Sequence, residues 1–291
     1  MTDSLVLHAH AKDLGGGFVV RRLLPAAQRQ AVGPFIFFDH FGPVTVTPDV
    51  NQDVRPHPHI GLATVTYLFS GVILHRDNLG SVQRIEPGAI NWMTAGSGVV
   101  HSERKPVEEK AATYVNHGLQ LWVALPEAEQ ERSAAFSHTP AHALPQIRDN
   151  PAQIRVLVGK AFGVESPVAT LSPTLYLDVE LPARAQWVLP MLEAEQAIYL
   201  VSGDLQLNGV EVALHTMVVL TGDCTLVAAD SGARLVVIGG QPLGRRLMWW
   251  NFVSTRKERI EQAAQAWELG DASMGMGPVP GDYERIPLPS R

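Results

Sequence analysis

Cysteine is nearly absent from this chain, since Cys224 is the one thiol among 291 residues. A single cysteine excludes a framework of intramolecular disulfides and fits a reducing compartment. Positive charge is not in excess either, because 23 Lys and Arg face 29 Asp and Glu, for a net charge of −6. That balance gives no electrostatic basis for direct binding to nucleic acid.

Long apolar runs are also missing. The apolar stretches are short and interrupted by Gly, Asp or Pro, so we expect no membrane-spanning helix. The first residues, MTDSLVLHAHAKDLGGG, lack the basic segment, apolar segment and cleavage site of a secretory signal. Hydrophobic residues nevertheless make up 46% of the chain, a content typical of a folded domain. We therefore expect a soluble cytoplasmic protein that binds no membrane.

Short runs rich in Val, Ile, Leu and Thr recur along the chain, separated by turn sequences. Examples of the runs are ATVTYLF (63–69), QAIYLVSG (196–203) and RLVVIGG (234–240). Pro87-Gly88 and Asn208-Gly209 are examples of the turns. This rhythm predicts an all-β fold of antiparallel sandwiches or barrels.

One helix is expected near the C-terminus, over residues 255–269. Thr255 and Glu258 fit a capping box, in which the hydroxyl and the carboxylate bind free N–H groups of the first turn. Gly270 marks the end of the helix. The helix has one apolar face and must dock on another element, because its apolar residues recur with helical spacing at Ile260, Ala263, Ala264 and Trp267.

The composition divides the chain into two β-rich parts. Residues 131–150 are polar, contain proline and are poor in β-branched residues, which predicts a connector. A weak internal repeat supports the division, since residues 64–80 and 197–213 both suggest a strand, a Ser-Gly turn and a second strand. The expected parts are a metal-binding domain at 1–130, the connector at 131–150, a domain without metal at 151–245, and a helix with a tail at 246–291.

Two strand-like segments each carry a polar pair with i, i+2 spacing. His57 and His59 open the segment RPHPHIGLATVTYLFSG, and His101 and Glu103 repeat the spacing in AGSGVVHSER. Side chains at i and i+2 of a strand share one face, so the four would converge if the two strands are neighbours. Three imidazoles and one carboxylate suit Fe, Mn, Ni, Cu or Zn.

The spacing alone leaves a second interpretation open, because a single His-x-His pair in a strand is often a surface pair. Two matched pairs favour a metal. Four protein ligands in an octahedral sphere would leave two positions for water, dioxygen or a substrate oxygen, which predicts a reactive site. In the second β-rich part His215 is the one histidine of the strand region, so we expect an apolar interior without metal.

These motifs resemble those of the cupin superfamily, and more narrowly those of the pirin family of bicupins. The resemblance extends to VGPFIFFDHFGP (32–43), HGLQLWVALP (117–126), SPTLYLDVELP (172–182) and GRRLMWWNFVST (244–255). It implies two antiparallel cupin (jelly-roll) β-barrels, with a C-terminal helix that packs back on the N-terminal barrel.

The same resemblance implies a metal site at His57, His59, His101 and Glu103. The expected cofactor is one divalent metal ion, iron by preference, with Mn, Co, Ni, Cu and Zn as alternatives. Pirins from several sources are similar in showing quercetinase activity, the cleavage of a flavonol by dioxygen with release of carbon monoxide. Other pirins are described as transcription cofactors that respond to the redox state of iron.

The sequence and the resemblance therefore predict two candidate functions. The first is a metal-dependent quercetin 2,3-dioxygenase that takes a small aromatic, flavonol-like substrate and O2. The alternative is a redox-sensing iron protein without turnover, which would act on a protein partner. Whether the chain is an enzyme stays open at this point, and a monomer is expected.

One position departs from the family pattern. Many pirins continue the first motif as His-x-His-x-Gly-x-Glu, whereas here Gly61 and Leu62 are followed by Ala63. With no carboxylate at residue 63, Glu103 is the one candidate for proton transfer, and base catalysis at residue 63 is in doubt.

Other polar residues receive structural interpretations. His75 and Asp77 lead into a turn, and the turn is favoured over contact with the site. His117 is interpreted as a core histidine and His138 as a solvated residue of the connector. Gly15 to Gly17 favour a hairpin turn over a phosphate loop, because no Lys-Ser/Thr pair follows them.

Overall fold

A computed structural model describes residues 4–14 and 18–290, so the glycines at 15–17 lie outside the described residues. The chain folds as two compact units that interleave in sequence. One unit holds residues 40–141 and 243–290 with the described part of 13–20, and we call it the histidine unit. The other holds 142–242 and 21–39 with the described residues up to Lys12, and we call it the apolar unit.

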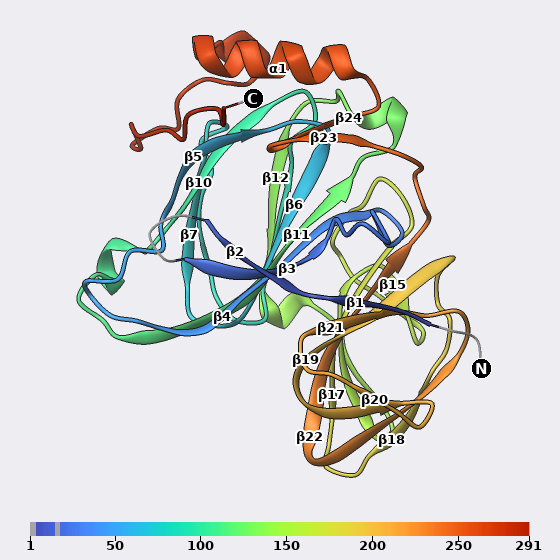
Figure 1. Cartoon of the computed structure of the whole chain (residues 1–291). Coiled ribbons are helices and arrows are strands. Elements are labelled where there is room, and N and C mark those ends of the chain that lie inside the picture. Colours follow the sequence, from blue (N-terminus) through green and yellow to red (C-terminus); the bar gives the residue numbers. More distant parts are fainter. Residues whose placement is uncertain (1–3, 15–17, 291) are drawn as a thin grey trace. The chain divides into compact units, whose positions relative to one another are not determined.

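The histidine unit is built on two antiparallel sheets (Figure 1). The smaller sheet has the order β5 (Val54–His59), β10 (Val99–Arg104), β7 (Ile73–Asp77) and β8 (Val82–Ile85). The larger sheet has the order β12 (Ala135–Thr139), β9 (Ile90–Thr94), β6 (Leu62–Ser70), β11 (Tyr114–Ala124) and β4 (Phe35–Val46). β3 (Val19–Leu24) and β2 (His10–Asp13) span the sequence boundaries of the two units. A short pair, β23 (Leu247–Trp249) and β24 (Phe252–Ser254), leads into the helix.

The helix α1 (Lys257–Leu269) packs on the histidine unit, as expected. Gly270 ends it in the left-handed conformation, with φ 66°, and its N–H binds the carbonyls of Ala266 and Trp267. A buried apolar cluster lies beneath the helix. It contains the four predicted apolar residues of the helix together with residues of neighbouring segments: Ile60, Val100, Phe252, Ile260, Ala263, Ala264 and Trp267.

The predicted capping box is wrong. The residue at the helix N-cap is Arg256, and no side chain caps the first turn there. The hydroxyl of Thr255 instead accepts a hydrogen bond from Nε2 of Gln130 at 2.7 Å, and the backbone N–H of Thr255 donates to Oε1 of Gln130 at 3.1 Å. The amide of Gln130, distant in sequence, thus binds the Thr255 hydroxyl that the sequence pattern predicted to cap the helix.

The apolar unit is one antiparallel sheet folded over itself. Its order is β1 (Leu5–His8), β21 (Thr216–Val219), β19 (Glu195–Leu207), β22 (Cys224–Gly240), β17 (Thr174–Leu181), β14 (Ala152–Val158) and β13 (Gln146–Asp149). β18 (Gln186–Leu189) pairs with β22 and β20 (Val210–Val212) with β19, and β15 (Lys160–Ala161) pairs with β16 (Val164–Glu165). Register shifts in β19 let these long strands turn from one layer to the next.

The interior of the apolar unit is hydrophobic. Its buried cluster includes Ile154, Leu177, Ile198, Leu226 and Val237. Cys224 belongs to the same cluster, and burial raises the pKa of its thiol to about 11, which fits a packing role. The two jelly-roll units and the docked helix confirm the predicted fold class, although the sheets are open sandwiches rather than closed barrels.

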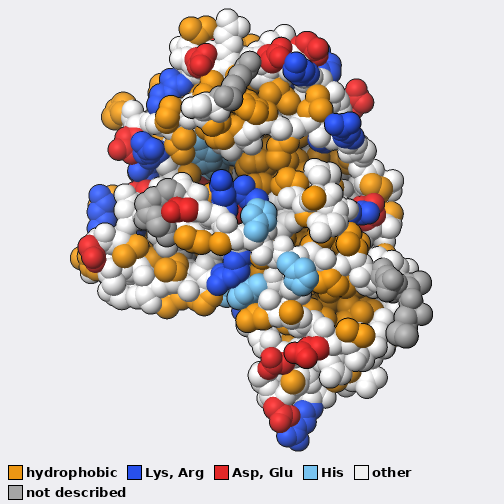
Figure 2. Space-filling view, in the orientation of Figure 1, with side chains coloured by type: hydrophobic (Ala, Val, Ile, Leu, Met, Phe, Trp, Pro, Cys, Tyr) orange, Lys and Arg blue, Asp and Glu red, His pale blue; other side chains and the backbone are white. Residues whose placement is uncertain are grey.

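The surface carries charges of both signs. On the face shown in Figure 2, Lys and Arg side chains stand beside Asp and Glu over the part that carries α1, with apolar side chains between them. A mixture of both signs is expected for a chain that carries 23 Lys and Arg and 29 Asp and Glu. Within residues 4–14 and 18–290, no helix has the length and apolar content needed to cross a membrane.

Gly61 joins the end of β5 to β6, and its replacement by alanine is expected to destabilise the protein. Its φ is +71°, and an added Cβ would overlap the carbonyl oxygen of Val253. Gly80→Ala is the matched control, because its φ is +94° while no atom lies within 4 Å of the added Cβ. Gly80→Ala should lower the free energy of unfolding by about 1–2 kcal/mol through backbone strain alone. Gly61→Ala should lower it by at least about 2 kcal/mol more. Urea unfolding measures both, and equal losses would contradict the prediction.

Candidate metal centre

Strands β5 and β10 bring the predicted histidines together. They pair antiparallel, with His101 opposite His57 and Val99 opposite His59. One ligand atom from each of His57, His59 and His101 lies within 4.8 Å of the other two, and all three residues are buried. The Nε2 atoms of His59 and His101 are 3.1 Å apart. Three of the four predicted ligands therefore converge on one point.

Glu103 lies on the same strand but outside this group. A register shift between His101 and Glu103 sets Glu103 opposite Val54. Its Oε1 accepts a hydrogen bond from the hydroxyl of Thr66 on β6, at 3.4 Å. The carboxylate therefore reaches across to the larger sheet, and its role as a fourth ligand stays a prediction.

Neighbouring groups orient the rings. Nδ1 of His57 donates to the carbonyl of Arg55 at 2.9 Å, which leaves Nε2 of His57 with a free lone pair. The ring of His59 stands edge-on to Trp122, with 5.2 Å between centroids. A backbone acceptor behind one ligand and an aromatic wall beside another fix the directions in which the lone pairs point.

Burial sets the protonation of the site. Desolvation lowers the pKa of His57 to about 4, and it lowers the pKa values of His59 and His101 well below the ordinary value, with the neighbouring histidines adding to the effect. The imidazoles are thus neutral at pH 7, which is the form that binds a metal. Desolvation also raises the pKa of the Glu103 carboxyl.

The donor set fits a transition metal ion. Two nitrogens bound to one ion at about 2.1 Å, with a right angle between them, lie about 3 Å apart. The 3.1 Å between Nε2 of His59 and Nε2 of His101 matches that spacing. Three neutral imidazoles form a nitrogen donor set that suits several first-row metals, and Glu103 would add an oxygen donor.

His75 and Asp77 do lead into a turn, but they also lie beside the histidine cluster, a contact that the sequence interpretation disfavoured. Both lie on β7, which pairs with β10 so that Asp77 is opposite His101 and His75 is opposite Glu103. Both are buried, and Nδ1 of His75 lies 3.4 Å from Nδ1 of His101. The signal was present in the sequence, because His75 and Asp77 repeat the i, i+2 spacing of the other two pairs.

A row of polar side chains crosses the larger sheet beside Glu103. The strand register sets His138 opposite Asn91, Asn91 opposite Thr66, and Thr66 opposite Gln120. Nδ1 of His138 lies 2.7 Å from Oδ1 of Asn91, and Oγ1 of Thr66 lies 2.9 Å from the side-chain amide of Gln120. His138 is therefore part of a structured strand and a hydrogen-bonded row, not a solvated connector residue.

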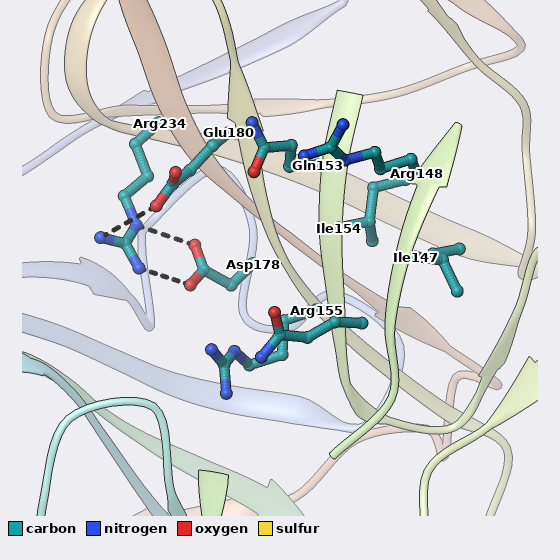
Figure 3. A pocket seen from close by; sticks show the side chains of 9 residues that line it. Ile147, Arg148, Gln153, Ile154, Arg155, Asp178, Glu180 and Arg234 are labelled. Atoms are coloured by element: carbon teal, nitrogen blue, oxygen red, sulfur yellow. Dashed lines mark hydrogen bonds and ion pairs between the residues drawn. The ribbon is translucent and has the colours of Figure 1, made fainter. Parts of the chain in front are cut away.

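Two further features lie apart from this cluster. His117 lies with His40, with 2.7 Å between their Nε2 atoms. The apolar unit has a polar groove on its sheet, in which Arg234 binds Asp178 through two hydrogen bonds and lies 3.4 Å from Glu180 (Figure 3). In that groove the carboxylates already have an arginine partner, so it does not form a ligand set of the kind seen in the histidine unit.

The metal-free protein should lose stability in mild acid. The folded-state pKa of His57 is about 4 and its ordinary value 6.5, so below pH 6.5 the unfolded chain binds more protons and unfolding is favoured. Between pH 7 and pH 5 this amounts to about 2 kcal/mol for His57 alone, and His59 and His101 act in the same direction. Urea unfolding at the two pH values measures the loss. His57→Gln should show a smaller loss, and identical curves at both pH values would contradict the prediction.

Comparison with known proteins places the chain in a family. The sequence model described as Pirin matches residues 17–123, and the one described as the Pirin C-terminal cupin domain matches residues 176–273. A pirin-like protein of Caulobacter vibrioides is 41% identical over 290 residues, which cover 98% of this chain and 99% of the relative. Pirin of Homo sapiens is 33% identical over 261 residues, which cover 86% of each chain.

Solved structures agree with this result. Quercetin 2,3-dioxygenase from Acinetobacter baumannii matches with a TM-score of 0.90 at 33% identity, over 99% of this chain and 95% of that one. A bacterial pirin of Escherichia coli in complex with nickel(II) matches with a TM-score of 0.64 at 15% identity, which supports the fold alone. The family and the histidine cluster together indicate a bound metal ion. The chain belongs to the pirin family.

Proposed function

We propose that the protein binds one divalent metal ion, iron by preference, through His57, His59, His101 and Glu103, and cleaves flavonols with dioxygen. The observation that carries this proposal is the convergence of three neutral, buried imidazoles from two paired strands. The likeness to a quercetin 2,3-dioxygenase over nearly the whole of both chains supports the choice of reaction.

The bound ion would supply Lewis acidity toward an enolic substrate oxygen and redox chemistry toward dioxygen. Glu103 would then accept the proton of the flavonol hydroxyl. Burial raises the pKa of its carboxyl in the metal-free protein, whereas a bound cation would lower it, so Glu103 would have to release the ion to accept the proton. The hydroxyl of Thr66 donates to Oε1 of Glu103 and so fixes the orientation of the carboxylate.

The larger sheet would orient the substrate. The row His138, Asn91, Thr66 and Gln120 offers amide, hydroxyl and imidazole groups to the hydroxyl and carbonyl groups of a flavonol. Aromatic side chains lie beside the row, since Trp122 contacts His59 and Phe136 stacks on His75. A planar aromatic substrate with polar edges would match these groups.

The absence of an acid at residue 63 does not weaken this role for Glu103. Thr64 is opposite Trp122, which contacts His59, and Thr66 contacts Glu103, so the even-numbered residues of β6 face the site. Side chains alternate along a strand, and Ala63 therefore points to the other face of β6. A carboxylate side chain at residue 63 would therefore begin on the face of β6 that points away from the site.

Loss of one imidazole should reduce metal binding sharply. His101→Ala removes a central ligand, because β10 lies between β5 and β7, and we expect at least a hundredfold weaker binding of Fe2+ or Co2+ with the fold retained. His215→Ala in the apolar unit is the control and should bind as the wild type does. Isothermal titration measures the affinity. If His57→Ala and His101→Ala both keep full occupancy, the proposed ligand set is wrong.

Turnover should depend on Glu103 more than metal binding does. Glu103→Gln keeps the size of the side chain but removes its basicity, so we expect a 10²- to 10⁴-fold lower rate of quercetin consumption with moderately weaker metal binding. The absorbance of the flavonol band under air and the release of carbon monoxide measure turnover. An iron-loaded wild type that leaves quercetin unchanged would overturn the dioxygenase assignment and favour the redox-sensing alternative.

A further inference from the structure

A chain of hydrogen bonds leads away from the site behind one of the ligands. Nδ1 of His101 lies 3.4 Å from Nδ1 of His75, and Nε2 of His75 lies 3.0 Å from Oδ2 of Asp77. His101, His75 and Asp77 are 1%, 4% and 1% exposed. We propose that Asp77 and His75 form a positioning relay that sets the tautomer and ring orientation of His101, a role that rests on the metal site proposed above.

The carboxylate determines where each proton lies. An ionised carboxylate only accepts, so Nε2 of His75 must carry the proton that binds Asp77. With one N–H on the His75 ring, Nδ1 of His75 would be an acceptor. The proton between the two rings then belongs to Nδ1 of His101, which leaves Nε2 of His101 as a lone pair. That nitrogen is the one 3.1 Å from Nε2 of His59, where the ion would bind.

Several contacts hold the relay in place. Oδ1 of Asp77 accepts the backbone N–H groups of Leu79 at 3.0 Å and Ser81 at 2.9 Å, so the turn after β7 fixes the carboxylate. Burial opposes ionisation of Asp77, but the hydrogen bonds from His75 and Ser81 outweigh it, and the pKa of the carboxyl lies below its ordinary value. The ring of His75 stacks on Phe136, with 4.3 Å between centroids and 16° between planes.

His75 is better explained as a support than as a further ligand. One of its nitrogens is bound to Asp77 and the other faces Nδ1 of His101, on the side of that ring away from Nε2. Simple packing does not explain the arrangement either. Burial of three polar side chains is costly unless they bind one another, and apolar residues would fill the same space without that cost.

Asp77→Asn tests the relay, because the amide keeps the shape of the carboxylate and can donate. An amide N–H directed at Nε2 of His75 would move the proton of His75 to Nδ1, and then the proton of His101 to Nε2, the nitrogen that should bind the ion. We expect a 10- to 100-fold weaker affinity for Zn2+, used as the probe. Asp178→Asn, a buried aspartate of the apolar unit, is the matched control and should not change that affinity.

Long-range 15N–1H NMR of the histidine rings reads the tautomer directly, with and without Zn2+. In the metal-free wild type the proton of His101 should lie on Nδ1, and in Asp77→Asn on Nε2. His75→Phe, which keeps the stacking on Phe136, should leave His101 in a mixture of both tautomers and weaken Zn2+ binding about tenfold. If Asp77→Asn does not fold, the tautomer of His101 and the Zn2+ affinity in His75→Phe still test the relay.

The outcomes separate this inference from the proposed function. A wild-type protein that binds no Zn2+, Co2+ or Fe2+ would overturn the metal site, while the tautomer of metal-free His101 would still support or refute the relay. The relay is wrong if the proton of His101 lies on Nε2 in the wild type. It is also wrong if Asp77→Asn and His75→Phe leave both tautomer and affinity unchanged.

Discussion

The register between β5 and β10 is the constraint on which the site depends. It sets His101 opposite His57 and, with the alternation of side chains, turns His57, His59 and His101 toward one face. A slip of one residue would move every one of these side chains to the other face. Because β10 also pairs with β7, the same strand places His75 and Asp77 behind His101. One pairing thus builds the ligands and their support together.

The C-terminal segment protects this register. β5 is an edge strand, which explains why it tolerates Pro56 and Pro58, neither of which has an N–H. The carbonyl of Pro56 accepts the N–H of Ile286, and the carbonyl of Ile60 accepts that of Val253, so residues far along the chain cover the free side of the edge. Nearby, Arg104 on β10 binds both carboxylate oxygens of Asp282.

Local periodicity predicted an antiparallel β fold and a shared face for each polar pair, whereas the bicupin form and the ligand set came from the resemblance to the pirin family. A period of two needs only neighbouring residues, and it holds for His57, His59 and His101. The remaining features depend on pairings between distant segments. The place of Glu103 depends on a register shift against β5, the hydroxyl of Thr255 binds Gln130, and the role of His75 depends on which strand lies beside β10. No local pattern encodes these partners, although the spacing of His75 and Asp77 did carry a signal.

The two units share one architecture but differ in the polarity of their interiors. The apolar unit fills its interior largely with apolar side chains, and its buried Asp178 is paired with Arg234. The histidine unit buries three neutral imidazoles, a relay and a polar row, and each of these groups needs a partner in place of water. For the nitrogens that face one another at 3.1 Å, a metal ion would be the strongest such partner. Any ion that binds only the folded state therefore stabilises that state, so metal binding and the stability of the histidine unit should be linked.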